Sequence, residues 1–270
     1  MHNESSTPYR LRILHISDLH ERGPRESESW RRRCVLGPAW ENNLRQLLDD
    51  GPVDLVCFTG DAADWGLAEE YEAATKHFVQ LLERIQLSPE RLFLVPGNHD
   101  VHRKTQRNTW LALHKALARD LDGLALSRWM AGLAEPPSGC KATWRKAILD
   151  RQGAYRAWLA GELARQGFSP AVSHHDGLGY RATVTLPSLP FPVHLIGLDT
   201  AWLAGDDNDS GRLRLTDNQI MRHATDADGK LRIPRLSGHR FHGKLDTQSA
   251  GNWTLIPGQP GHLFQGKLDT

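Results

Sequence analysis

Three stretches of this 270-residue chain place carboxylate, amide or imidazole side chains directly after short apolar runs. These side chains are Asp18 and His20 after the first run, Asp61 after the second, and Asn98, His99 and Asp100 after the third. Hard oxygen ligands mixed with imidazole suit Mn, Fe or Zn better than Ca. Two such ions that share a carboxylate are the usual arrangement for hydrolysing phosphate esters. The residue types therefore predict a site for two divalent metal ions, which would be Mn, Fe or Zn.

The three apolar runs are predicted to be strands of a parallel sheet. The run through Phe58 is short and buried in character, and Gly60 then permits a tight turn before Asp61. Apolar residues recur at helical spacing over residues 40–48 and 67–87, which indicates a crossover helix between each pair of strands. Because ligands of open α/β sheets bind at the carboxyl ends of the strands, the three stretches should meet at one edge.

Each of these residues also has a simpler interpretation. A single Asp after a strand is more often a helix cap or a turn residue than a metal ligand. His15 lies inside the first strand, and we interpret it as a packed histidine or one that supports a ligand. The occurrence of three such stretches, each after an apolar run, favours metal binding for Asp18, His20, Asp61 and Asn98.

The order of the three motifs is itself informative. Asp-x-His is followed by Gly-Asp-x-x-Asp and then by Gly-Asn-His-Asp, all within Leu11–Asp100. In this order and spacing the chain resembles the calcineurin-like metallophosphoesterase superfamily. The resemblance implies a layered α/β sandwich that hydrolyses phosphomonoesters or phosphodiesters through a metal-bound hydroxide at a dinuclear site. The Asn-His-Asp form of the third motif leans toward the phosphodiesterase and nuclease side of the superfamily.

The resemblance also implies a role for each site residue. Asp18 and His20 would bind one metal ion, Asp61 would bridge the two ions, and Asn98 would bind the second ion. Two residues would be catalytic: His99 would contact the phosphate and assist the leaving group, and Asp100 would orient His99.

Composition excludes several classes of protein. With 33 basic and 32 acidic residues, the chain has no strong field to attract nucleic acid or a membrane surface. No run approaches the ~18 apolar residues of a membrane span, and residues 1–10 lack the apolar core of a secretory signal. Three widely spaced cysteines indicate neither a disulfide framework nor a zinc knuckle. We therefore expect a cytoplasmic protein whose partner is a phosphate-ester substrate.

The chain divides into three predicted regions. Residues 1–10 are expected to be disordered, 11–225 to form the phosphoesterase domain, and 226–270 to form an irregular tail. Within the domain, residues 101–170 are helical in character and predict a cap over the metal site. Such caps shape the substrate pocket in the related enzymes, so the resemblance implies that this segment selects the substrate. The Arg-rich stretch Glu21–Arg33 could bind phosphate, or it could be a solvated loop.

The C-terminal part departs from the expected plan. Two further strands are predicted at 180–186 and 193–198, and Thr216–Gln219 has the capping-box signature of a helix through His223. His174 and His175 precede these strands, whereas the ligand histidine follows them in the family's usual order, so the resemblance disfavours both as ligands. His239 and His242 are the remaining candidates for the second metal, although no apolar strand leads into them.

The tail contains a repeat of the form GH-x-F-x-GKLDT. Residues 238–247 return as residues 261–270 with eight of ten positions identical, and no apolar periodicity lies between the copies. We therefore expect the C-terminal part of the sheet to be incomplete. This leaves a second hypothesis open, in which the chain is a catalytically impaired remnant or a phosphate-binding regulatory domain of a longer protein.

Overall fold

The computed structural model describes residues 9–27, 36–118, 122–168, 178–206, 209 and 213–224. Contacts divide the chain into Met1–Arg232 and Ile233–Thr270, and all described residues belong to the first unit. The predictions for the tail, its repeat and four histidines lie outside the described residues. These histidines are His174, His175, His239 and His242. The same holds for residues 1–8 of the N-terminal stretch.

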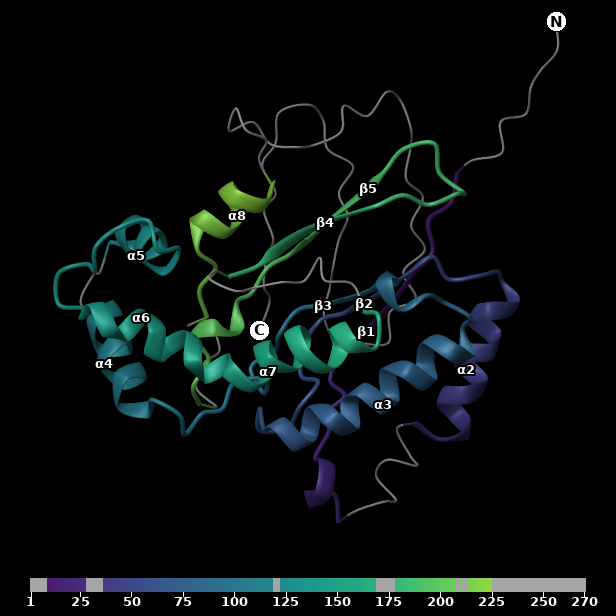
Figure 1. Cartoon of the computed structure of the whole chain (residues 1–270), viewed down its shortest axis with the longest axis horizontal. Helices are drawn as coiled ribbons and strands as arrows, with labels where there is room; N and C mark the ends of the chain where they lie inside the picture. The colour runs from purple at the N-terminus through teal and green to yellow at the C-terminus, as the bar shows by residue number, and fades with distance from the viewer. Residues whose placement is uncertain are drawn as a thin grey trace, which may run out of the picture. The chain divides into compact units, whose positions relative to one another are not determined.

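A three-stranded parallel sheet forms the centre of the first unit (Figure 1). Its strands are β1 (Ile13–Ile16), β2 (Leu55–Phe58) and β3 (Leu92–Leu94), in the order β1-β2-β3. Ile13 pairs with Leu55, and Val56 pairs with Leu92. The predicted strands and their parallel order are confirmed.

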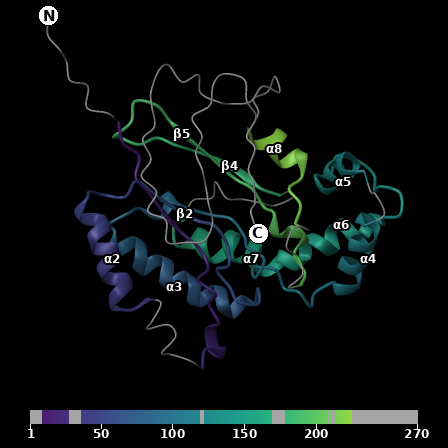
Figure 2. The ribbon, with the colours of Figure 1, turned by 180° about the vertical axis from the view of Figure 1, so that it is seen from behind.

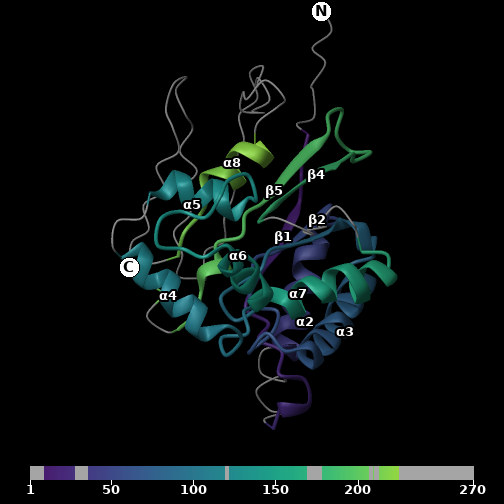
Figure 3. The same ribbon diagram turned by 60° about the vertical axis from the view of Figure 1, so that its left-hand side comes forward.

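Side chains of β2 and β3 alternate between two cores, as the two-residue period of a strand requires. One face of the sheet packs against the helices α2 (Pro38–Asp49) and α3 (Ala68–Arg84). The side chains on this face are Val56 and Phe58 of β2 and Leu92 and Leu94 of β3. Leu55 and Phe93 face the opposite side, where they pack with the antiparallel hairpin of β4 (Tyr180–Val184) and β5 (Val193–Gly197). Figure 3 shows this order of helices, sheet and hairpin. The fold is therefore mixed α/β, as predicted.

The helical segment after β3 belongs to two cores. Helices α4 (Arg107–Leu117), α5 (Gly123–Met130) and α6 (Ala142–Leu149) pack around Trp110 and Trp129, together with the η6 turn (Ala201–Leu203). By contrast, α7 (Gly153–Trp158) packs against α3 in the helical layer, as Figure 2 shows from behind. Its Trp158 stacks on Tyr71 at 4.9 Å between ring centroids. The expectation of one cap over 101–170 thus differs from the structure, in which α7 joins the main core.

The remaining short elements connect these parts. They are η1 (Gly23–Arg25), η2 (Pro89–Arg91), η3 (Asp150–Gln152), η4 (Leu159–Leu163) and α8 (Asp217–Ala224). Helix α8 begins after Thr216 as predicted. The Gln219 side chain in this helix accepts a hydrogen bond from the backbone N of Asp199 and donates one to the backbone O of Asp199, each at 2.8 Å. No helix within the described ranges is both long and apolar enough to cross a membrane.

Candidate metal centre

The loops that follow β1 and β2 continue the hydrogen bonding of the sheet. The amides of Asp18, His20 and Glu21 donate to the carbonyls of Gly60, Asp61 and Ala62 at 3.0, 2.8 and 2.9 Å. Parallel strands end at the same edge, so this pairing places the motif residues of both loops side by side. Backbone hydrogen bonds therefore place Asp18, His20 and Asp61 side by side at the edge of the sheet.

Three of the predicted ligands have left-handed backbone conformations. The φ angles of Asp18, His20 and Asp61 are 60°, 45° and 61°. A positive φ is uncommon for residues other than glycine and costs free energy that the surrounding structure must supply. Such conformations cluster at functional sites, so their coincidence here supports a site at this edge.

Two glycines allow the second and third loops to touch. A Cβ on Gly60, whose φ is 118°, would lie 2.7 Å from the Cα of Gly97. A Cβ on Gly97 would lie 2.2 Å from Oδ1 of Asp61. The close approach lets Asp61 Oδ1 accept a hydrogen bond of 2.8 Å from the amide of His99. The Gly-Asp and Gly-Asn motifs are thus interlocked through their backbones.

Asp18, His20 and Asp61 form a group whose ligand-type atoms all lie within 4.8 Å of one another. His20 Nε2 lies 3.6 Å from Asp18 Oδ1 and 3.9 Å from Asp61 Oδ2. These separations are too long for hydrogen bonds. They fit two ligands of one ion, because atoms each about 2.0–2.2 Å from a metal can be up to about 4.4 Å apart. The donor set therefore fits a divalent transition metal.

A second group shares His20 and adds Asp64 and His99. His20 Nδ1 lies 3.7 Å from Asp64 Oδ1, and the rings of His20 and His99 are perpendicular with centroids 4.6 Å apart. Asp64 is the last residue of the Gly-Asp-x-x-Asp motif, and it is not among the ligands predicted from the sequence. The motif itself was the signal that could have identified it.

His99 is oriented by Asp64. Its Nδ1 lies 2.7 Å from the backbone carbonyl oxygen of Asp64. A carbonyl can only accept, so Nδ1 must carry the proton of this hydrogen bond. The Nε2 atom is then the ring nitrogen that can accept or donate a proton elsewhere.

Asp100 lies where the second and third loops meet. Its carboxylate accepts hydrogen bonds from the amides of Asp61, Ala63 and Gly97 at 2.9, 3.0 and 2.9 Å. Burial raises the pKa of Asp100 to about 6, and the bonds from backbone amides oppose that rise. Among the described residues, the ring nitrogen Nδ1 of His99 bonds the Asp64 carbonyl and not the Asp100 carboxylate. Asp100 therefore holds the loops together through their amides, and its orienting role toward His99 stays a prediction.

Asn98 lies in the third loop, directly after Gly97, and is half-buried. Its side chain makes no hydrogen bond to another described residue, so the amide oxygen is available to a ligand. The expected histidine partners at 239 and 242 lie outside the described residues. Asp61 and Asn98 are therefore the two predicted ligands of the second ion that the structure describes.

Two arginines of the Arg-rich stretch lie beside this centre. Arg22 Nε is 3.2 Å from Asp64 Oδ2, and Arg25 bonds the buried carboxylate of Glu70. Glu70 also accepts the backbone amides of Trp65 and Leu67 at 3.0 and 2.9 Å. These two arginines therefore brace the loops through carboxylates, whereas Arg31, Arg32 and Arg33 lie outside the described residues.

His15 differs from its expected environment. The prediction was a packed or supporting histidine, but the residue is exposed on the outer side of β1. Its Nε2 lies 2.7 Å from Oγ1 of Thr59, the residue before Gly60. It therefore contacts the strand end and belongs to neither metal-type group found among the described residues.

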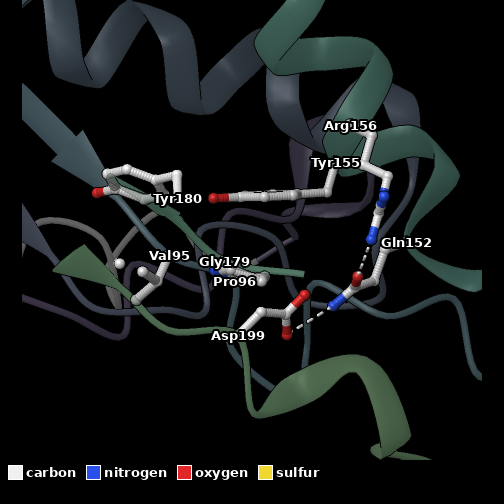
Figure 4. A pocket seen from close by; sticks show the side chains of 9 residues that line it. Val95, Pro96, Gln152, Tyr155, Arg156, Gly179, Tyr180 and Asp199 are labelled. Atoms are coloured by element: carbon white, nitrogen blue, oxygen red, sulfur yellow. Dashed lines mark hydrogen bonds between the residues drawn. The ribbon is translucent and has the colours of Figure 1, made fainter. Parts of the chain in front are cut away.

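A small pocket lies between the end of β3 and the hairpin (Figure 4). Gln152 donates to Asp199 Oδ1 at 3.1 Å and accepts from Arg156 at 3.2 Å. Burial raises the pKa of Asp199 to about 6. Tyr155 also lines the pocket, and its buried hydroxyl has no hydrogen-bond partner in the part of the chain that the structure describes. None of these side chains belongs to the metal-type groups found among the described residues.

Comparison with known proteins identifies the family. Residues 11–158 match the calcineurin-like phosphoesterase family, and this match covers more than half of the chain. The chain therefore belongs to that family, which confirms the resemblance seen in the three motifs. No curated protein matches the chain.

Proposed function

We propose that this member of the calcineurin-like phosphoesterase family hydrolyses phosphomonoesters or phosphodiesters at a centre for two divalent metal ions. The observation that carries the proposal is the convergence of Asp18, His20 and Asp61 within 4.8 Å at the carboxyl edge of the sheet. Their left-handed backbones and spacings beyond hydrogen-bond range favour a bound cation over a purely structural cluster.

The proposed ligands divide between two ions, which would be Mn, Fe or Zn. Asp18 and His20 would hold the first ion and Asn98 the second, with Asp61 shared between them. His239 and His242 are the proposed further ligands of the second ion. When bound, the ions would lower the pKa of a water molecule and neutralise charge on the phosphoryl oxygens.

His99 is the proposed general acid. Its Nδ1 donates to the Asp64 carbonyl, which fixes the ring and leaves Nε2 to give a proton to the leaving oxygen. Such a transfer typically contributes about 10²–10⁴-fold to the rate. Asp100 would act indirectly, because its carboxylate fixes the amides of Asp61 and Gly97.

A second hypothesis is supported by the ligand count of the described residues. The first ion has three proposed ligands there, but the second has Asp61 and Asn98 only. A chain with a weak second site would be a catalytically impaired remnant or a phosphate-binding regulatory domain. We propose a cytoplasmic location, supported by Cys57 and Cys140, which are free thiols.

The hydrolase hypothesis is tested with bis-p-nitrophenyl phosphate and p-nitrophenyl phosphate in Mn²⁺. The wild-type chain should release p-nitrophenol, and Asp61→Asn should abolish release because both ions lose a shared ligand. Phosphate binding without turnover would instead favour the regulatory hypothesis. Full activity in Asp61→Asn would exclude the proposed centre.

A separate comparison of variants decides whether the first ion binds to Asp18, His20 and Asp61 or to His20, Asp64 and His99. Asp18→Asn should weaken Mn²⁺ binding at least tenfold in equilibrium dialysis, since Asp18 belongs to the proposed ligand set. Asp64→Asn is the matched variant from the other group, and it should retain the ion. The reverse result would assign the first ion to His20, Asp64 and His99.

A further inference from the structure

Trp65 is an exposed aromatic residue beside the candidate metal centre. It is 51 % exposed and directly follows Asp64, which forms a metal-type group with His20 and His99. The backbone carbonyl of Asp64 also accepts the hydrogen bond from His99 Nδ1 at 2.7 Å. The ring of Trp65 is therefore attached one residue away from both a metal-type carboxylate and the contact that orients the proposed general acid.

The backbone on both sides of Trp65 is held in place. Its own amide donates to the buried carboxylate of Glu70 at 3.0 Å. The next residue is Gly66, whose φ is 67°, and a Cβ there would lie 2.9 Å from the backbone nitrogen of His102. Gly66 thus packs directly against the segment that follows the third loop. The fold therefore fixes where Trp65 stands relative to the centre.

The indole ring of Trp65 has one covered face. The guanidinium of Arg25 lies over the ring, with its central carbon 4.0 Å from the ring centroid, and the buried carboxylate of Glu70 bonds Arg25. Because about half of Trp65 is exposed despite this contact, the exposed surface includes the opposite face. Lys104 is exposed, and its ammonium nitrogen, 5.6 Å from the centroid, adds positive charge beside the ring.

The position of Trp65 distinguishes it from an ordinary exposed side chain. Single exposed apolar residues are common on protein surfaces, so exposure alone assigns no role. Here an open aromatic face stands next to the groups that would hold a phosphate. Nucleobases of every type stack on such faces, and a neighbouring cation favours an anionic ligand. A nucleotide combines both features in one molecule.

We propose that Trp65 determines substrate specificity by stacking on the nucleobase of a free nucleotide whose phosphate binds at the metal centre. The inference rests on the proposed function, because it takes the phosphate to bind at the two-metal centre. It goes further by naming the substrate class, which is nucleotide phosphoesters in preference to those of aliphatic alcohols and sugars. Trp65 acts on binding, whereas the proposed metal ions and His99 act on the ester bond.

Calorimetric titration of the full chain in Mn²⁺ tests the stacking without requiring turnover. The probes are the phosphonate analogues of AMP and of ribose 5-phosphate, in which carbon replaces the ester oxygen, so neither can be hydrolysed. They share the phosphonate and the sugar and differ in the base. Wild type should bind the AMP analogue at least about fivefold more tightly, because stacking on an aromatic side chain contributes at least that factor.

Three variants make the result specific. Trp65→Ala should bind the two analogues equally, whereas Trp65→Phe, which keeps an aromatic face, should retain part of the preference. The matched control is Phe191→Ala, because Phe191 is 45 % exposed but lies between β4 and β5. This control should keep the full preference. Melting temperature and bound Mn²⁺, measured for each variant, show that the fold and the centre are intact.

The proposal is overturned if wild type binds the two analogues equally or binds neither. It is also overturned if Trp65→Ala keeps the preference, if Trp65→Phe loses it completely, or if Phe191→Ala loses it. An adenylate hexamer that binds more tightly than the AMP analogue would overturn the assignment to a free nucleotide and favour a nucleic-acid strand.

Hydrolysis of bis-p-nitrophenyl phosphate, measured in parallel, separates this inference from the proposed function. A preference for the base without hydrolysis supports the role of Trp65 and contradicts the hydrolase hypothesis. Hydrolysis without a preference for the base contradicts the role of Trp65 alone.

Discussion

The parallel sheet and the β4–β5 hairpin differ in how they use polar groups at their strand ends. After β1, β2 and β3, carboxylate and imidazole side chains converge on one another, and backbone hydrogen bonds and Asp100 hold their loops. After β5, Asp199 points into a small pocket, where Gln152 and the amide of Trp202 bond it. Both metal-type groups found among the described residues come from the parallel half.

This difference separates two uses of a buried carboxylate. Asp61 keeps Oδ2 directed at His20 while Oδ1 takes one amide, so it can still bind an ion. Asp199 and Asp100 are each surrounded by donors and act as braces. The parallel half therefore carries the proposed chemistry, and the hairpin covers the opposite face of the sheet.

Among the substitutions that test this difference between the parallel sheet and the hairpin, we expect the largest loss of stability and of metal binding at Gly97. Gly97→Ala would place a Cβ 2.2 Å from Asp61 Oδ1 and 2.5 Å from the Asp61 amide nitrogen, so the interlocked loops must separate. We expect a loss of about 3 kcal/mol or more in urea unfolding, together with loss of metal binding.

Gly161→Ala is the matched control. Its added Cβ meets nothing within 4 Å, and Gly161 lies in the helical η4 segment. The change should be neutral or should stabilise by up to about 1 kcal/mol. Equal effects of the two substitutions would contradict the interlocking of the loops.

His99→Ala should separate chemistry from metal binding within the parallel half. Loss of the proposed general acid should lower kcat by about 10²–10⁴-fold while metal content is unchanged. His15→Ala is the control, because His15 lies on the same sheet but contacts Thr59. Loss of metal from His99→Ala would instead make His99 a ligand, as the group with Asp64 allows.

A smaller effect is expected from Asp199 in the other half. Its pKa is raised to about 6, so the protonated form is favoured in the fold. The associated stability is fully present below the ordinary pKa of about 3.9 and is lost as pH rises through about 6, at most about 3 kcal/mol. Asp199→Asn should therefore weaken the decline in urea midpoint between pH 4 and pH 7. Unchanged pH dependence in this variant would show that Asp199 is not perturbed.

Local patterns were sufficient to predict the strands of the parallel sheet and the residues at its edge. Each strand is an apolar run that ends at a glycine or a polar residue, and both crossover helices repeat with helical period. Asp18, His20 and Asp61 were identified because they follow such runs directly. Their contacts come from strand pairing, which a parallel order of strands already implies.

The bracing role of Asp100 could not be predicted in this way. Asp100 bonds amides 37–39 residues earlier in the chain, and those bonds exist only after the glycines bring the loops together. The position of α7 in the main core likewise depends on Trp158, whose indole nitrogen donates to Thr75 at 2.8 Å. Contacts between residues that lie so far apart along the chain leave no periodic signal in the sequence.

The most direct test of the account is the metal content of two full-length variants after dialysis against limiting Mn²⁺. Asp61→Asn changes the parallel half, and the double variant His239→Ala/His242→Ala changes the tail. We predict that the double variant keeps one tightly bound ion per chain, because Asp18, His20 and Asp61 hold it, and that Asp61→Asn keeps none. Loss of that ion from the double variant, or its retention by Asp61→Asn, would contradict the claim that the parallel half alone holds the first metal.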